Sequence, residues 1–81
     1  MNELPVNPLK PEQVTRLENN FVYHAPINRQ AERYEKIREF AKSFSELIMR
    51  LTPESREQSL ALTDIESAVM WANAAIARNE K

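Results

Sequence analysis

No glycine occurs anywhere in this chain of 81 residues, and that absence narrows the range of possible folds sharply. Glycine supplies the positive backbone φ angles that tight hairpin turns between strands require. Without it, the glycine-rich loops that cradle nucleotide phosphates are excluded too. The chain contains five prolines, which interrupt helices. The composition therefore predicts an all-α fold, in which helices are separated by proline-containing breaks.

The charge and the metal-binding side chains exclude several further classes of protein. Cysteine is absent, so neither a disulfide nor a thiolate metal site can hold the fold together. His24 is the only histidine, so one chain cannot build a histidine-based metal cluster. The formal net charge of −1 gives no overall attraction to DNA, RNA or an anionic membrane. We expect no metal and no cofactor, and any bound anion must be held by a few local arginines.

No targeting or membrane segment is expected. The N-terminus lacks a basic segment followed by an apolar stretch, so the pattern of a signal peptide is missing. No apolar run approaches the roughly 20 residues that span a bilayer. The sequence thus predicts a soluble, cytoplasmic protein.

Residues 1–25 differ from the rest of the chain and are predicted to form an N-terminal arm. Prolines at positions 5, 8 and 11 prevent a helix before residue 11. A short helix from Pro11 to about Asn19 is expected, because proline suits the first helical position. Residues 21–24 are predicted to be a short extended segment.

Residues 26–81 are predicted to form a helical-hairpin domain. The first long helix should begin at about Ile27 or Asn28, with Asn28 as its N-cap, and end at residue 51. Thr52 should cap a second helix that starts at Pro53 and ends near residue 79. So short a connection requires the two helices to run antiparallel.

Both long helices carry more apolar surface than a hairpin can bury. Each has a seam at alternating intervals of three and four, which is the spacing of one helix face. The seams consist of Tyr34, Ile37, Ala41, Phe44, Ile48 and Leu51, and of Leu62, Ile65, Val69, Ala72 and Ile76. Phe40 and Leu47 add a second stripe, and Ala61, Ala68 and Ala75 form a strip of small residues. This excess predicts a closed, symmetric homo-oligomer, with dimers as its building unit.

A few side chains suggest binding, although each has a structural alternative. Tyr23 lies on the arm, from which an aromatic ring can stack on a planar base, an interaction of about 1–3 kcal/mol. His24 is either a partly exposed loop residue or a hydrogen-bonding or stacking group in a ligand pocket. Arg56 and Arg78, taken alone, fit ordinary helix surface, and Arg78 also suits the helix dipole. Arginine is nevertheless the side chain that holds a phosphate with a two-pronged fork.

The second long helix carries two unusual residues for a plain packing helix. Trp71 is expected to anchor an interface between subunits. Asn73 is flanked by alanines, and an amide is an odd choice for a core position there. Asn73 is therefore expected to hydrogen-bond across an interface or to a ligand.

Four segments of the chain resemble the helical-hairpin domain of phage sponge proteins, and together they cover residues 21–79. They are Phe21-x-Tyr23-His24-x-Pro26, Gln30-x-x-Arg33-Tyr34-Glu35-x-Ile37-Arg38, Pro53-x-Ser55-Arg56-Glu57-Gln58-Ser59-Leu60-Ala61-Leu62-Thr63 and Ala68-Val69-Met70-Trp71-Ala72-Asn73-Ala74-Ala75-Ile76-Ala77-Arg78-Asn79. Such sponges include anti-CBASS proteins and the C-terminal hairpin of a Thoeris anti-defence protein. The latter has a further N-terminal β-rich domain, for which 25 residues are too few, so the short anti-CBASS type is expected. The proline-rich start matches no pattern of the family.

The resemblance implies a function and a set of site residues. Sponges of this kind are hexamers of hairpins that sequester cyclic dinucleotides at paired interfaces and, in some members, cyclic trinucleotides at three-fold sites. They act in the host cytoplasm during infection, evade host defence without cleaving the ligand, and need no DNA or membrane partner. By this resemblance Tyr23 stacks on a base, Arg38 binds phosphate and Arg78 serves a three-fold site. Arg56 and His24 are weaker ligand-binding candidates.

Symmetry makes such a ligand reasonable for a nearly neutral chain. A cyclic dinucleotide has two phosphates and two bases related by an approximate two-fold axis, and a symmetric dimer offers each binding group twice. Two other hypotheses remain open. One is a structural oligomerisation module without a small-molecule ligand, and the other is a nucleotide hydrolase in which His24 or a carboxylate activates water.

Overall fold

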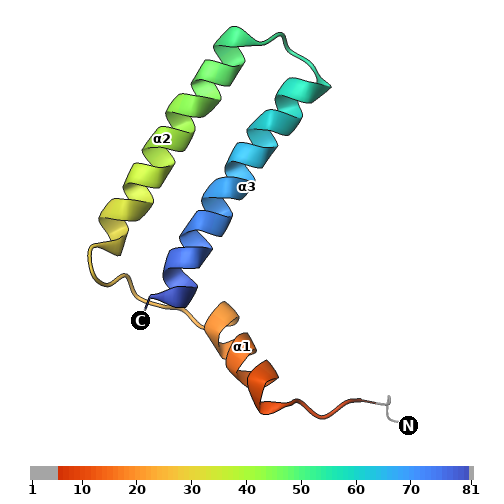
Figure 1. The fold of residues 1–81 in the computed structure, drawn as a ribbon, viewed down its shortest axis with the longest axis vertical. Helices are drawn as coiled ribbons and strands as arrows, with labels where there is room; N and C mark the ends of the chain where they lie inside the picture. The colour runs from red at the N-terminus through yellow and green to blue at the C-terminus, as the bar shows by residue number, and fades with distance from the viewer. Residues whose placement is uncertain (1–5, 81) are drawn as a thin grey trace.

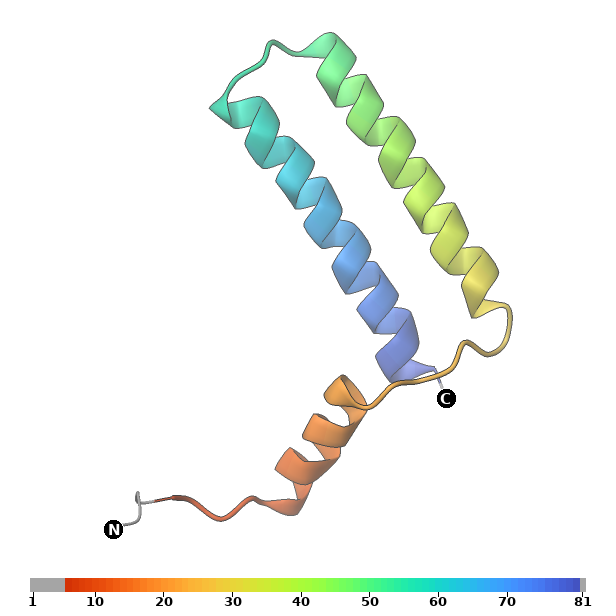
Figure 2. The same cartoon turned by 180° about the vertical axis from the view of Figure 1, so that it is seen from behind.

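The computed structural model describes residues 6–80, which contain three helices and no strand. The helices are α1 (Pro11–Phe21), α2 (Gln30–Leu51) and α3 (Arg56–Asn79). α2 and α3 lie side by side and antiparallel, whereas α1 projects away from the end of the hairpin where α2 begins and α3 ends (Figures 1 and 2). The predictions of an all-α fold and of a helical hairpin are confirmed.

α1 begins at Pro11, as predicted, and its first turn is fastened by side-chain hydrogen bonding. The backbone N–H of Lys10 donates to Gln13 Oε1 at 2.9 Å. The helix continues to Phe21, because the N–H of Val22 still donates to the carbonyl of Glu18 at 3.0 Å. The prediction that the extended segment starts at Phe21 was therefore wrong, and the backbone becomes extended only at Val22.

The turn into α2 differs from the prediction, because Asn28 is not the N-cap. Asn28 and Arg29 both have positive φ angles, 49° and 61°, and Arg29 directly precedes the helix. Left-handed backbone costs a non-glycine residue roughly 1–2 kcal/mol. Gln30 closes this turn: its N–H donates to the carbonyl of Ile27 at 2.9 Å, and its Oε1 accepts from the Ile27 N–H at 3.0 Å. Two hydrogen bonds thus stabilise a turn that glycine would otherwise make.

The loop between α2 and α3 also corrects a prediction. Thr52 does not cap α3; its N–H and Oγ1 both donate to the carbonyl of Ile48 and so close α2. Ser55 is the N-cap of α3, and its Oγ accepts from the N–H of Gln58 at 3.1 Å. The Gln58 amide donates to both the carbonyl and the hydroxyl of Thr52, at 3.1 Å each. Because the Thr52 hydroxyl already bonds to the end of α2, the hydroxyl of Ser55 caps α3 instead.

The open end of the hairpin is closed by an ion pair between α2 and the residue that follows α3. Arg33 donates two hydrogen bonds to the carboxylate of Glu80, at 2.5 and 2.7 Å. The Gln30 amide donates to the same carboxylate at 3.3 Å. The hydrogen bonds from Arg33, and then that from Gln30, lower the pKa of Glu80 to about 2. The same contact raises the pKa of Arg33. We call these three residues the end clasp.

A single hairpin buries very little. Among residues 6–80 the only buried side chain is that of Gln30, and no apolar one is buried. Ile37, Ile48, Ile65 and Val69 of the seams are half-buried, while Phe40 is 72% exposed. The radius of gyration is 18.7 Å, against about 12 Å for a compact domain of this length. The core is thus one seam between two helices, open to both sides.

Candidate functional site

A cleft of about 540 Å³ lies at the clasped end of the hairpin, where all three helices contribute side chains. This volume is within the range of small-molecule sites, about 300–1,000 Å³. The end of α1 comes close to the end of α3 in both views of the fold (Figures 1 and 2). Two walls can be described, one from α1 and the linker that follows it, the other from α2 and α3.

The first wall carries amides and aromatic rings. Asn19 and Asn20 come from the last turn of α1, and Tyr23 and His24 from the extended linker. Nε2 of His24 donates to the carbonyl of Asn19 at 2.9 Å, which holds the imidazole against the helix end. Tyr23 is 82% exposed, so its ring is free to stack on a planar ligand.

The second wall carries positive charge beside small side chains. Arg38 stands on α2, and Arg78 stands in the last turn of α3, where its charge suits the helix dipole. Within residues 6–80 neither arginine forms an ion pair. Ala74 and Ala77 line the same cleft, and their small side chains leave room for a ligand. The wall therefore offers two free guanidinium groups, which suit phosphate oxygens.

The structure brings four of the five sequence-predicted site residues to this one cleft: Tyr23, His24, Arg38 and Arg78. Arg56 is not among them. It is the first residue of α3, at the opposite end of the hairpin. At about 1.5 Å per residue, it lies about 33 Å along the helix from Arg78. Arg38 and Arg78 line the same cleft, although the resemblance assigns them to two different kinds of site.

Sequence reasoning singled out Asn73 as unusual, and the structure places it in the cleft. It missed the contributions of Asn19, Asn20 and Tyr34. Asn19 was expected only to end the short first helix, and Tyr34 only to belong to the apolar seam of α2. The available signal was a pair of amides in the last turn of α1, three and four residues before Tyr23, where a helix end presents polar side chains to a linker.

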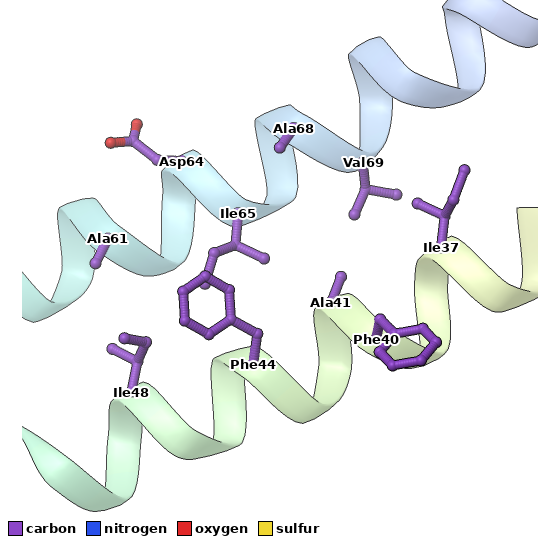
Figure 3. A pocket seen from close by; sticks show the side chains of 10 residues that line it. All are labelled: Ile37, Phe40, Ala41, Phe44, Ile48, Ala61, Asp64, Ile65, Ala68 and Val69. Carbon is purple, nitrogen blue, oxygen red and sulfur yellow. The ribbon is translucent and has the colours of Figure 1, made fainter.

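A second concave surface, the apolar groove, runs between α2 and α3 and measures about 710 Å³ (Figure 3). Phe44 lies toward Ile65 across the groove, and Asp64 points its carboxylate away from the apolar side chains. Trp71 is 67% exposed and lies one helical turn beyond Ala68, which lines the groove. With Asp64 as its one titratable group, the groove offers a packing surface rather than a reaction site.

Metal-binding and membrane-spanning features are both absent from residues 6–80. Within the described residues, no group of three His, Cys, Asp or Glu side chains is placed to hold a metal ion. None of the helices of residues 6–80 is long and apolar enough to cross a membrane.

Comparison with known protein families identifies a relationship for most of the chain. A family model described as Acb2/Tad1, hairpin domain, matches residues 13–77. The match begins within α1, contains all of α2 and stops shortly before the end of α3. No curated protein and no solved structure matches the chain.

Proposed function

This chain belongs to the Acb2/Tad1 hairpin-domain family, and from that premise we propose that it sequesters cyclic di- or trinucleotide second messengers without cleaving them. The family is one of phage sponges for cyclic nucleotides, known for binding rather than catalysis. The protein acts, on this proposal, in the cytoplasm of an infected host, where it lowers the free concentration of a defence signal.

One observation supports the proposal most strongly: the cleft holds a free aromatic ring beside unpaired arginines. A cyclic dinucleotide presents planar bases and phosphates within one compact ring. Tyr23 stacks on a base, and Arg38 grips a phosphate oxygen pair with its planar fork. His24 contributes mainly by holding the linker in place through Asn19. Binding needs no strong overall charge, because the arginines act locally.

The proposal includes self-association, which the shape of the chain supports. A hairpin with no buried apolar side chain in its described part leaves the apolar groove in water. A second copy can cover the groove, with Trp71 as an anchor at its rim. A closed assembly of dimers, up to a hexamer, would place clefts in symmetric pairs and so match the two-fold symmetry of a cyclic dinucleotide.

The two remaining arginines fit this assembly in different ways. We assign Arg78 to a three-fold site, where three copies would present it to the three phosphates of a cyclic trinucleotide. Arg56 reaches a ligand only if another subunit brings it there, because its own cleft is about 33 Å away. Its contribution to binding is therefore expected to be smaller than that of Arg38.

The rival function is a structural oligomerisation module, which the apolar groove alone would favour. Light scattering of the purified protein followed by calorimetric titration with cyclic di- and trinucleotides separates the two. We expect submicromolar binding, with one dinucleotide per two chains or one trinucleotide per three. A well-formed oligomer that binds no member of the panel would leave only the structural module.

The same sample tests whether the ligand survives. After incubation, heat denaturation and chromatography, a sponge returns the cyclic nucleotide unchanged and in full yield. Linear products accumulating with time would instead establish a hydrolase.

A further inference from the structure

Two residues that line the cleft carry a buried amide oxygen with no hydrogen-bond partner within residues 6–80. These oxygens are Oδ1 of Asn19 and Oδ1 of Asn73. Buried polar atoms in folded proteins are nearly always paired, because an unpaired one loses its bond to water without replacement. Such an atom at a binding surface calls for an explanation, and a ligand that supplies the missing donor is one.

The two asparagines line the same cleft although they are far apart in the sequence. Asn19 lies in the last turn of α1, Asn73 lies on α3, and both line the cleft that holds Tyr23 and Arg38. The backbone carbonyl of Asn19 is already occupied by His24, which restrains this residue and leaves its side chain for another partner.

The chemistry of a carboxamide narrows what the partner can be. An unpaired carbonyl oxygen needs an N–H or O–H donor, and a phosphate diester has only acceptors. In a cyclic nucleotide the donors are the N–H groups of the bases and the ribose hydroxyls. Tyr23 provides a stacking surface on the same wall as Asn19, so a base held there presents its edge to the cleft. Amides are also suited to adenine, because they pair with it through both oxygen and nitrogen.

We propose that Asn19 and Asn73 read the base edge of the bound nucleotide and select purines that carry an exocyclic amino group. This inference rests on the proposed function and extends it from ligand class to base preference. Arg38 binds a phosphate and Tyr23 stacks on a base, and both contacts are independent of which base is present. The two asparagines discriminate between bases.

Matched ligands test the selection directly. Cyclic di-AMP and the corresponding cyclic dinucleotide of purine riboside differ only in the amino group. We expect the wild-type protein to bind the amino-bearing ligand about tenfold or more tightly in calorimetry, since a buried acceptor left unpaired costs about that much. Equal affinities would overturn the inference and leave the sponge function intact, whereas no binding of either ligand would overturn both.

Variants assign the selection to the asparagines. Asn73→Leu and Asn19→Leu replace the amide by an apolar group of similar volume. Each variant should bind the amino-bearing and the amino-free ligand with nearly equal affinity, while its affinity for the amino-free ligand stays that of the wild type. Asn79→Leu places the same change on α3 outside the cleft and should retain the preference. Asn19 lies outside the hairpin, so this variant remains informative even if Asn73→Leu fails to fold.

The asparagine oxygens could instead accept hydrogen bonds from the ribose hydroxyls. A third ligand distinguishes this explanation from recognition of the base. The 2′-deoxy analogue of cyclic di-AMP keeps the amino group and removes the sugar donor. Tight binding of this analogue supports base reading. A tenfold loss that appears with the deoxy ligand in the wild type, and disappears in Asn73→Leu, would assign the asparagines to ribose and overturn the inference.

Discussion

At the scale of single residues, the proposed binding surface depends on side chains that have no structural task of their own. Tyr23 is 82% exposed and Arg38 has no ion-pair partner among residues 6–80. Exposed aromatic rings and unpaired guanidinium groups add little to the stability of a monomer. Substituting them should therefore change binding far more than folding.

Tyr23→Ala should weaken cyclic dinucleotide binding by about tenfold or more, because base stacking is worth about 1–3 kcal/mol. Tyr23→Phe keeps the ring and should retain most of the affinity. Phe21→Ala removes an equally exposed ring that does not line the cleft, and it should bind as the wild type does. Calorimetry provides the measurement, and an unaffected Tyr23→Ala would remove this residue from the site.

Arg38→Gln and Arg78→Gln test whether the two arginines serve one ligand or two. Arg38→Gln should lower the affinity for cyclic dinucleotides about tenfold, and Arg78→Gln should act mainly on cyclic trinucleotides. Independent sites give additive losses in the double variant. If both substitutions weaken the same dinucleotide, and their effects are not additive, the two arginines share the cleft in which the structure places them.

At the scale of helices and turns, hydrogen bonds at the helix ends position the elements that form the site. The end clasp joins the start of α2 to the end of α3, directly beside the cleft. Ser55 and Gln58 perform the corresponding task at the other end of the hairpin. Because the seam alone buries little, these polar contacts help to fix the register of the two helices.

The end clasp should make stability depend on acid pH. The Arg33 hydrogen bonds depress the pKa of Glu80 from 4.5 to about 2, so the pair stabilises the folded state fully above pH 4.5. As pH falls from about 4.5 to 2, Glu80 binds a proton and this contribution is lost. Glu80→Gln should therefore melt below the wild type at pH 7 and close to it at pH 2.

Thermal melts followed by circular dichroism provide this comparison. Glu35→Gln removes a carboxylate from α2 that forms no ion pair among the described residues, and it should track the wild type at both pH values. A deficit in Glu80→Gln that persists unchanged at pH 2 would show that the clasp does not act through its charge.

Ser55→Ala should destabilise the hairpin by about 1 kcal/mol, the usual cost of a lost N-cap hydroxyl. Denaturant unfolding measures the change. Thr52→Val, which removes a hydroxyl bonded to Ile48 and Gln58, distinguishes the cap of α3 from the closure of α2. If Ser55→Ala were neutral while Thr52→Val was costly, Thr52 would be the residue on which the start of α3 depends.

At the scale of the whole molecule, the described part of the chain is extended and has little core of its own. Its dimensions are 57 × 38 × 18 Å, and no apolar side chain is buried within residues 6–80. Small domains usually need a disulfide, a metal or oligomerisation to reach adequate stability. The chain has no cysteine, so association between copies is the proposed source.

Phe40→Glu should convert the assembly to smaller species, because it places a charge in the apolar groove. Light scattering at micromolar concentration would report the change in mass. Ser43→Glu adds the same charge to α2 outside the groove and should leave the mass unaltered. The melting temperature of the wild type should rise with protein concentration, as mass action requires. A wild-type chain that is monomeric and melts independently of concentration would contradict the assembly.

The hairpin could be predicted from the sequence because its determinants are local. Seam periodicity and one proline break specify two helices, and a short loop makes them antiparallel. The exact caps could not be predicted. Thr52 and Ser55 are both good cap residues, and the choice depends on Gln58, which reaches back to Thr52 from the next helix. The positive φ angles of Asn28 and Arg29 could not be predicted in a chain without glycine. They are tolerated because hydrogen bonds from Gln30 stabilise the turn.

The site was less accessible to sequence reasoning. Tyr23 and Arg78 are far apart in the sequence, and only the resemblance to sponge proteins placed them in one function. Arg33 and Glu80 meet at one end of the hairpin although they are 47 positions apart in the sequence, so no local pattern predicts their ion pair. In the sequence, Asn19 looks like an ordinary residue at the end of a helix. Only the structure shows that it lines a cleft together with residues of α3.

The cleft takes one wall from residues 19–24 and the other from α2 and α3, so a molecule in the proposed site would join the first segment to the hairpin. On the proposed function a ligand is held by contacts from both walls at once, so the loss of either wall would weaken its binding. A protein that breaks no bonds can silence a signal only while it holds it. On the proposed function, the affinity and the number of sites would therefore together determine how many copies a cell needs.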